Sequence, residues 1–225
     1  MTTPYLRQRD LLVPAQAAGF DIDLIGAGSL GGAILLGMLK MGFGERNRVR
    51  VWDGDRCEPH NLATQWFRVS DAAQRRPKVD AVSDTALWVC DREIEVREIR
   101  FTGSENTRIG PLVVLAVDSL AERRLIWTRL REREDVTLVI DARMGAEVVE
   151  VLAVELGSPG TDGYEASLAG EPVKEPCTRR AIVYTGLGAA ALVCSMLRSH
   201  VRGERFSRHV MLDLRQFLIE STPPC

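Results

Sequence analysis

Residues 20–42 read FDIDLIGAGSLGGAILLGMLKMG. The segment FDIDLI alternates apolar and polar residues and then meets glycines, which predicts a β-strand. The apolar spacing of the following AILLGMLKM is typical of a helix, and Gly42 marks the place where that helix stops. A strand, a glycine-rich turn and a helix in this order predict the opening unit of an α/β fold.

The turn inside this unit has the pattern Gly-x-Gly-x-x-Gly, made by Gly26, Gly28 and Gly31. Glycines let a backbone approach phosphate closely, and a helix N-terminus supplies unpaired N–H groups and positive potential. We therefore predict a nucleotide-binding loop that includes Ser29 and Leu30. The alternative is a glycine turn that only lets the helix pack on the sheet.

Strands and helices continue to alternate beyond this unit. Strands are expected at residues 48–52, 94–101, 111–118 and 136–143, and helices at 77–90 and 119–135. The run at 111–118 is apolar up to its final aspartate, as in a strand covered on both faces. This alternation predicts an α/β fold with a doubly wound, Rossmann-like, mainly parallel sheet flanked by helices. The apolar run at 148–156 is expected to add a strand, with an antiparallel direction as one option.

We expect one domain over residues 1–225. Its parts are an N-terminal arm at 1–19, a nucleotide-binding core at 20–156, a crossover loop at 157–177, and a C-terminal helix with a closing segment at 178–225. The crossover is rich in glycine, proline and acidic residues and has little periodicity. Such a composition predicts a long mobile connection.

The bulk composition narrows the class of protein. With 45% hydrophobic and 27% charged residues, the chain resembles an ordinary soluble globule that buries a full core. Its formal net charge of -2 gives no overall attraction to nucleic acid or to an acidic membrane, so neither partner is expected. The uncharged stretch 181–197 is shorter than the roughly 20 residues that span a bilayer, which favours a buried helix.

The cysteines and the N-terminus indicate a compartment. No secretory signal is visible in MTTPYLRQRDLL, because no positively charged region precedes an apolar run. The five cysteines form no Cys-x-x-Cys pair, so the usual spacing of a structural zinc site is missing. An odd number of thiols without a signal predicts reduced cysteines and a cytoplasmic location.

A second set of residues follows the glycine loop. Asp53 comes 22 residues after Gly31, at the end of the second strand, where an acid binds ribose hydroxyls in dinucleotide folds. The glycine loop and Asp53 alone would fit an NAD(P)-dependent oxidoreductase equally well. The chain, however, continues with further polar motifs: Asp53-Gly54-Asp55, Asn61-Leu62-Ala63-Thr64-Gln65, Pro77-Lys78-Val79 and Val117-Asp118.

As an ordered set, these motifs resemble those of the ThiF/MoeB/E1 superfamily, the adenylating enzymes that activate ubiquitin-like proteins and sulfur carriers. Its members carry a glycine-rich loop, Asp-x-Asp, Asn-Leu-x-Arg-Gln, a lysine that opens the next helix, and an aspartate after a later strand. The resemblance runs over roughly residues 5–145, and YLRQRDLL at 5–12 is similar to the family's arginine-containing N-terminal arm. The chain looks like a minimal short form.

The resemblance implies ATP and Mg²⁺ as cofactors. Asp53 would bind the ribose, while Asn61 and Gln65 would line the phosphate and adenylate side. Asp55 has no assigned contact and is a candidate for ordering this loop. In adenylation a carboxylate attacks the α-phosphate of ATP and pyrophosphate leaves, so a site for two anions must neutralise charge and align the attack.

Two residues are the expected catalytic pair of this reaction. Lys78, in the first turn of its helix, would act as a point charge over the phosphates, and its alternative is a solvated lysine. Asp118 emerges at the carboxyl edge of the sheet, where ligands bind in such folds. By resemblance it would hold Mg²⁺, which commonly takes one or two protein carboxylates plus phosphate oxygens. The alternative for Asp118 is a helix N-cap.

The pattern departs from the family at Thr64, which replaces an arginine expected to touch the phosphates. Candidates for a substitute are Arg68, Arg75 and Arg76 nearby, and Arg7 or Arg9 reaching over from a second subunit. The helix after Asp118 also offers Arg123 or Arg124 where the family often has an arginine. Without a substitute, the chain would adenylate slowly or only bind nucleotide.

A second nucleophile is indicated by Glu175-Pro176-Cys177-Thr178, which resembles the surroundings of the E1 catalytic cysteine. A thiol at a helix N-terminus beside Arg179 and Arg180 should have a lowered pKa, which suits attack on an acyl-adenylate to give a thioester. The alternatives are a small joining residue or a cysteine buried in a dimer contact. For Arg143 two roles stay equally open: it could bind the incoming carboxylate, or it could form an internal ion pair.

The predicted function is therefore an ATP-dependent adenylyltransferase. Its partner would be a ubiquitin-like or sulfur-carrier protein, or a peptide, with a slim Gly-Gly-type C-terminus, and the chain is expected to form a homodimer with composite sites. Two alternatives stay open. One is an NAD(P)-dependent Rossmann oxidoreductase, and the other is a non-catalytic E1-like partner subunit, for which Thr64 is the best argument.

Overall fold

The computed structural model describes residues 4–157, 161–170 and 182–223, and these build one eight-stranded sheet with the order β3-β2-β1-β4-β5-β6-β7-β8. The first five strands in this order are parallel: β3 Glu95–Arg97, β2 Val49–Trp52, β1 Ile22–Ile25, β4 Leu112–Leu115 and β5 Leu138–Gly145. The last three run antiparallel: β6 Val148–Glu155, β7 His209–Asp213 and β8 Leu218–Ser221. The predicted fold class is confirmed, and β6 takes the antiparallel option.

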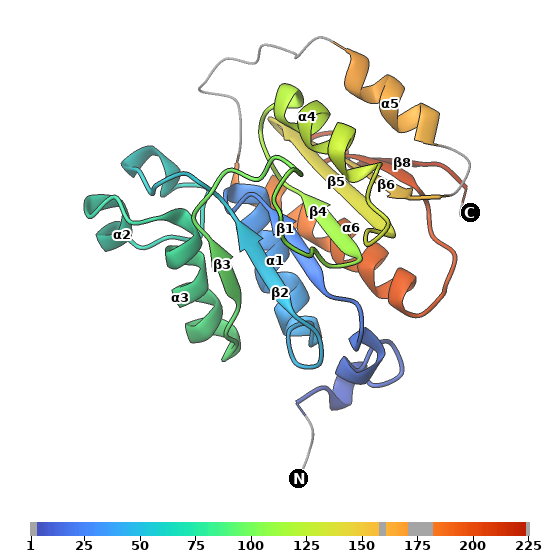
Figure 1. The fold of residues 1–225 in the computed structure, drawn as a ribbon. Helices are drawn as coiled ribbons and strands as arrows, with labels where there is room; N and C mark the ends of the chain where they lie inside the picture. The colour runs from blue at the N-terminus through green and yellow to red at the C-terminus, as the bar shows by residue number, and fades with distance from the viewer. Residues whose placement is uncertain (1–3, 158–160, 171–181, 224–225) are drawn as a thin grey trace.

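Helices cover both faces of the sheet (Figure 1). They are α1 Ser29–Met41, α2 Val69–Ala73, α3 Lys78–Cys90, α4 Leu120–Leu130, α5 Thr161–Ala169 and α6 Val183–Val201. Three 3-10 helices precede or join them: η1 Leu6–Gln8, η2 Pro14–Ala17 and η3 Pro59–Asn61. Helices α1 and α6 pack together on one face, whereas α4 and α5 lie on the other.

The core follows from the alternation of side chains along each strand. On β4, Leu112 and Val114 join the apolar cluster that contains α1 and α6, whereas Val113 and Leu115 join the cluster that contains α4 and α5. All four are fully buried, as expected for a strand with a helix on each face. The continuous apolar run in the sequence is thus explained by two cores rather than one.

The N-terminal arm packs far from the glycine loop. Figure 1 shows this segment at the bottom of the view, at the amino end of β1. Gln8 on η1 donates a hydrogen bond of 2.7 Å to the carbonyl of Met41, the last residue of α1. Since the glycine loop lies at the other end of this 13-residue helix, about 20 Å separates the two.

The expected crossover at 157–177 is wrong in one respect: residues 161–169 form helix α5 instead of irregular chain. Tyr164 and Leu168, spaced four apart, are both buried and give the helix one apolar face. The Tyr164 ring packs edge-on against Trp127 of α4 at 4.8 Å between centroids. Tertiary packing overrides a polar, glycine-containing local sequence here. Residues 171–177 lie outside the described part of the chain.

The C-terminal region contains one element that was expected and one that was not. The expected helix at 181–197 is α6, and its buried residues pack on α1. Among the described residues, no helix is both long enough and apolar enough to cross a membrane. The closing segment forms the β7–β8 hairpin, which the sequence did not predict because its strands are short and every residue of β8 is exposed.

Candidate functional site

The glycine loop is shaped by close backbone contacts at the N-terminus of α1. Gly26 has φ +102°, and a Cβ there would lie 2.7 Å from the carbonyl oxygen of Ala116. A Cβ on Gly31 would lie 1.9 Å from the Gly26 carbonyl oxygen, so helix and loop touch backbone to backbone. Gly28 is the N-cap of α1 and is not crowded in this way: a Cβ on it would meet only the Gln65 amide nitrogen at 3.9 Å.

This contrast gives a matched pair of variants. Gly31→Ala should lower the free energy of unfolding by roughly 3 kcal/mol, because its Cβ overlaps a backbone oxygen that cannot move aside. Gly28→Ala should change it by less than about 1 kcal/mol, since the added methyl group makes only ordinary contacts. Urea unfolding of both proteins measures the difference. Equal losses for the two variants would contradict this description of the loop.

Asp53 connects the end of β2 to the glycine loop. Its two carboxylate oxygens accept hydrogen bonds from the backbone N–H of Ala27 and of Asp55, each at 2.8 Å. Burial raises the pKa of this carboxyl above its ordinary value, and the Ala27 hydrogen bond and nearby Lys78 oppose that rise. Because each oxygen keeps a second lone pair, Asp53 can also accept a ribose hydroxyl.

Lys78 begins α3 and points to the loop after β2 rather than to solvent. Its ammonium lies 2.9 Å from the Asp55 carboxylate, and its backbone N–H donates to the Asp55 carbonyl at 2.9 Å. Only 12% of the side chain is exposed, which does not fit a solvated lysine. Asp55 therefore has a clear local partner, and its role in ordering this loop stays a prediction.

The loop of Asn61 and Gln65 lies beside the glycine loop. The Asn61 side-chain oxygen accepts a bond of 3.0 Å from the Glu58 N–H, so this group caps its own turn. The Gln65 side-chain oxygen is buried without a hydrogen-bond partner among the described residues, and so is the hydroxyl of Ser29. Buried polar atoms are normally paired. Two unpaired ones beside a phosphate-type loop therefore fit a polar ligand such as ATP.

Asp118 follows β4 at the carboxyl edge of the sheet. It is exposed, and within the described part of the chain its carboxylate makes no hydrogen bond or ion pair. The N-cap of α4 is Ser119, whose hydroxyl accepts from the Glu122 N–H at 3.3 Å, so the capping alternative for Asp118 is wrong. No group of three or more His, Cys, Asp or Glu among the described residues could hold a metal ion. Mg²⁺ at Asp118 would thus need phosphate oxygens as well.

Two residues near this edge were not expected from the sequence, Glu122 and Arg100. Glu122 lies in the first turn of α4, and the Arg100 guanidinium lies 3.3 Å from its carboxylate. Burial raises the pKa of Glu122, Arg100 lowers it, and Asp118, Asp55 and Asp53 raise it further. Four acids thus gather at one edge. Ser119-x-x-Glu122 is a capping-box pattern that could have placed Glu122, but nothing marks Arg100.

The arginines considered as substitutes for Thr64 are held elsewhere. Arg68 and Arg76 both pair with Asp71 and Asp84, and Arg75 pairs with Glu58 at 2.9 Å. Arg7 and Arg9 are exposed on the distant N-terminal arm, so they cannot reach the glycine loop of their own chain.

Three further arginines, Arg123, Arg124 and Arg143, make contacts within the sheet and with α5. Arg123 is buried and pairs with Asp141 at 2.8 Å, while Arg124 donates to backbone carbonyls at the end of α5. Arg143 pairs with Asp141 at 2.8 Å and with Glu150 at 3.3 Å, so this structure favours its internal ion pair over a role in binding an incoming carboxylate.

Three of the five cysteines, Cys57, Cys90 and Cys194, lie in the part of the chain that the structure describes. Cys177 lies outside the described residues, although α6, which follows it in sequence, passes the glycine loop: a Cβ on Gly186 would lie 3.2 Å from the Ser29 oxygens. Burial raises the pKa of Cys57 to about 11 and that of Cys194 to about 12. Both are therefore thiols rather than thiolates, as expected for structural cysteines.

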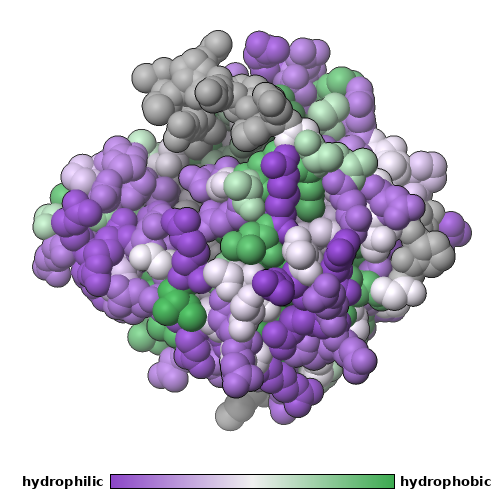
Figure 2. All heavy atoms as spheres, turned by 45° about the horizontal axis from the view of Figure 1, so that its top comes forward, coloured by the Kyte–Doolittle hydropathy of each residue, from purple (hydrophilic) through white to green (hydrophobic). Residues whose placement is uncertain are grey.

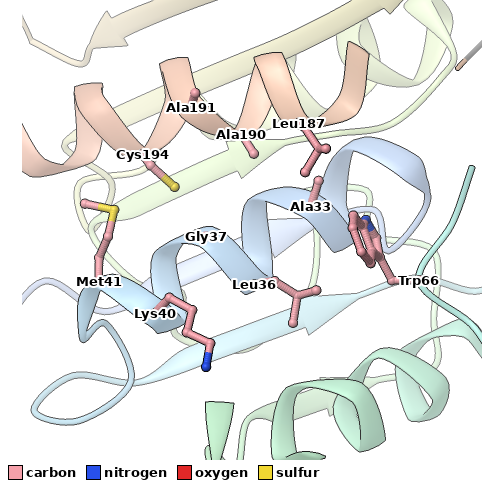
Figure 3. A pocket seen from close by; sticks show the side chains of 10 residues that line it. All are labelled: Ala33, Leu36, Gly37, Lys40, Met41, Trp66, Leu187, Ala190, Ala191 and Cys194. Atoms are coloured by element: carbon pink, nitrogen blue, oxygen red, sulfur yellow. The ribbon is translucent and has the colours of Figure 1, made fainter. Parts of the chain in front are cut away.

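A shallow apolar groove of about 360 Å³ lies between α1 and α6 (Figure 3). Leu36 and Trp66 line one side, and Leu187 and Cys194 line the other. By contrast, the face brought forward in Figure 2, which includes the top of Figure 1, is mostly hydrophilic with a smaller apolar area near its centre.

Comparisons with known proteins agree with this architecture. The ThiF family model matches residues 16–195. A crystal structure of E. coli MccB with ATP has a TM-score of 0.72 and 14% sequence identity, covering 98% of this chain and 71% of that one. The microcin C7 biosynthetic enzyme MccB with N-formylated MccA has a TM-score of 0.70 at 14% sequence identity. That match covers 98% of this chain and 72% of the MccB chain.

A crystal structure of PaaA is similar to the same degree, with a TM-score of 0.70 at 16% identity. The match covers 93% of this chain but 64% of PaaA, so this chain spans less than two thirds of that relative. No curated protein sequence gives a significant match. At these identities the likeness to the solved structures is one of fold.

Proposed function

This chain belongs to the ThiF family, and from that premise we propose that it uses ATP to adenylate the C-terminal carboxylate of a small protein or peptide. The observation that carries the proposal is the pair of unpaired, buried polar atoms on Ser29 and Gln65 beside the glycine loop. In bound ATP a phosphate oxygen would accept from the Ser29 hydroxyl, and a ribose hydroxyl or the adenine amino group would donate to the Gln65 oxygen. The MccB structure with ATP gives further support.

In the proposed reaction, negative charge on the phosphates lies near groups that can stabilise it. A carboxylate oxygen of the carrier attacks the α-phosphorus, the bond to the β-phosphate oxygen breaks, and pyrophosphate leaves. The N-terminus of α1 and the Lys78 ammonium would stabilise the phosphates. Asp118 would hold Mg²⁺, which when bound supplies positive charge to the triphosphate.

The nucleoside and carrier ends of the site are also part of the proposal. Asp53 would bind the ribose, and Gln65 with Asn61 would line the adenylate side. A carrier with a slim, Gly-Gly-type C-terminus suits a carboxylate that must reach the α-phosphate. The proposed class includes peptides as well as ubiquitin-like and sulfur-carrier proteins, and MccB has been solved with MccA. Transfer of the acyl group to Cys177 stays a prediction from the sequence.

Exchange of labelled pyrophosphate into ATP tests the proposal. We expect exchange that depends on a carrier, chosen from small proteins and peptides encoded beside this chain. No exchange with any of them, together with no binding of ATP, would overturn it. Binding of ATP without exchange, and exchange only after a second ThiF-like chain is added, would instead support the non-catalytic partner that Thr64 suggests. Binding of NAD(P) alone would favour an oxidoreductase.

We further propose a homodimer with composite sites. The groove between α1 and α6 is apolar, and Val183, Tyr184 and Leu187 at the start of α6 are at least 40% exposed. Arg7 and Arg9 lie about 20 Å from their own glycine loop, so they could serve only the loop of a second copy. Sedimentation as a monomer at every concentration used for the exchange assay would contradict this arrangement.

A further inference from the structure

A continuous chain of ion pairs crosses the nucleotide end of the sheet. The Lys78 ammonium at the start of α3 lies 2.9 Å from Asp55 in the loop after β2. Asp55 in turn lies 3.9 Å from Arg100 in the loop after β3, and Arg100 lies 3.3 Å from Glu122 in α4. Four segments that are distant in sequence are thus linked by alternating charges.

This arrangement conflicts with the role proposed for Lys78. A lysine that stabilises phosphates has to turn its ammonium from Asp55 to the nucleotide. The Asp55 carboxylate would then lose its closest cation while it still interacts with the charges of Asp53 and Glu122. Like charges at such short range are unfavourable, and an incoming triphosphate would add to them. Release of Lys78 therefore needs another cation for Asp55.

We propose that Arg100 takes over the Asp55 carboxylate when nucleotide draws Lys78 away, and so acts as a positioning residue for Lys78. This inference rests on the proposed function. The Arg100 Nη2 is already at the outer limit of an ion pair with Asp55, and its side chain is 68% exposed and free to close the remaining distance. A guanidinium presents five donors in a planar fork, so Arg100 can bind Asp55 and Glu122 together.

The backbone supports the same exchange. A Cβ on Gly54 would lie 3.0 Å from the Arg100 backbone nitrogen, so the loops after β2 and β3 touch beside Asp55. The neighbouring arginines are engaged with other acids: Arg56 pairs with Glu98, and Arg97 pairs with Glu95 at 3.6 Å. Arg100 is therefore the cation that the loops bring to Asp55 when Lys78 leaves.

The test compares MgATP affinity by isothermal titration calorimetry in four full-length proteins: unsubstituted, Arg100→Ala, Asp55→Asn, and the double variant. Arg100→Ala should weaken binding about tenfold, because Lys78 stays on Asp55. In the double variant the acid that retains Lys78 is gone, so affinity should return to within about threefold of Asp55→Asn alone. Arg100→Lys should keep most of the affinity, and Arg97→Ala, at the end of β3 just before this loop, is the matched control.

The outcomes separate this inference from the function it rests on. Unchanged binding in Arg100→Ala overturns it. So does a double variant as weak as Arg100→Ala, because Arg100 would then act on the nucleotide or on the fold and not through Asp55. Unsubstituted protein that binds MgATP without such a rescue leaves the proposed function standing. Failure of the unsubstituted protein to bind MgATP overturns both. The midpoint of thermal unfolding, measured for each variant, identifies loss of fold.

Discussion

Asp118→Ala is expected to lower carrier-dependent pyrophosphate exchange by about 10³-fold, the upper range for loss of one group that stabilises charge in a transition state. The reason is local. The residue lies at the carboxyl edge of the sheet, is exposed, and makes no ion pair or hydrogen bond within the described residues, so its charge is available to a metal ion. For the same reason, its removal should leave the free energy of unfolding unchanged.

The matched control is Glu134→Ala, an exposed carboxylate beyond the opposite end of α4. It should exchange at the unsubstituted rate. Titration with Mg²⁺ gives a second measurement, because the Asp118 variant should need much more Mg²⁺ for its residual activity. An Asp118→Ala protein that keeps more than about a tenth of the exchange rate would rule out the assigned role.

Asp141→Ala is expected to lower the free energy of unfolding by about 4 kcal/mol, within the range seen when one partner of a buried ion pair is removed. Asp141 is fully buried and accepts from Arg123 and Arg143 at 2.8 Å and from the Tyr164 hydroxyl at 3.1 Å. Truncation would leave the Arg123 guanidinium, which is 5% exposed, as an uncompensated charge in the core. Urea unfolding measures this loss.

Asp135→Ala provides the comparison. Its partner Arg133 lowers the pKa of the Asp135 carboxyl, but both side chains reach solvent, and such pairs contribute less than about 1 kcal/mol. Because Asp141 also binds Tyr164 of α5, its loss should speed amide hydrogen exchange over residues 161–169. Similar losses for the two variants would mean that the buried network does not stabilise the fold.

The order of elements could be predicted from the sequence because strands and helices alternate with clear periods and the glycine turn starts the first unit. Elements held mainly by distant partners could not. Helix α5 depends on two apolar residues, Tyr164 and Leu168, that find a surface on α4 only after folding. The strands of the β7–β8 hairpin are short, and β8 is fully exposed. They therefore give no recognisable alternation of apolar and polar residues.

The candidate site divides in the same way. Residues within the recurring motifs, such as Asp53, Lys78 and Asp118, were expected from their order along the chain, and their assigned roles stay predictions. Arg100 and Glu122 could not be expected as neighbours, because β3 and β4 lie on opposite sides of the β2–β1 pair. Arg123 and Arg143 needed the three-dimensional structure to show that they share one buried acid.

The antiparallel end of the sheet has a practical consequence. None of the residues assigned to nucleotide chemistry comes from β6, β7 or β8, and the turn at 214–217 is exposed or half-exposed. Evolution, or a protein engineer, can therefore lengthen that turn or replace it with a foreign module while the residues proposed to bind nucleotide are left untouched. A short scaffold of this kind can therefore gain an accessory domain at its antiparallel flank.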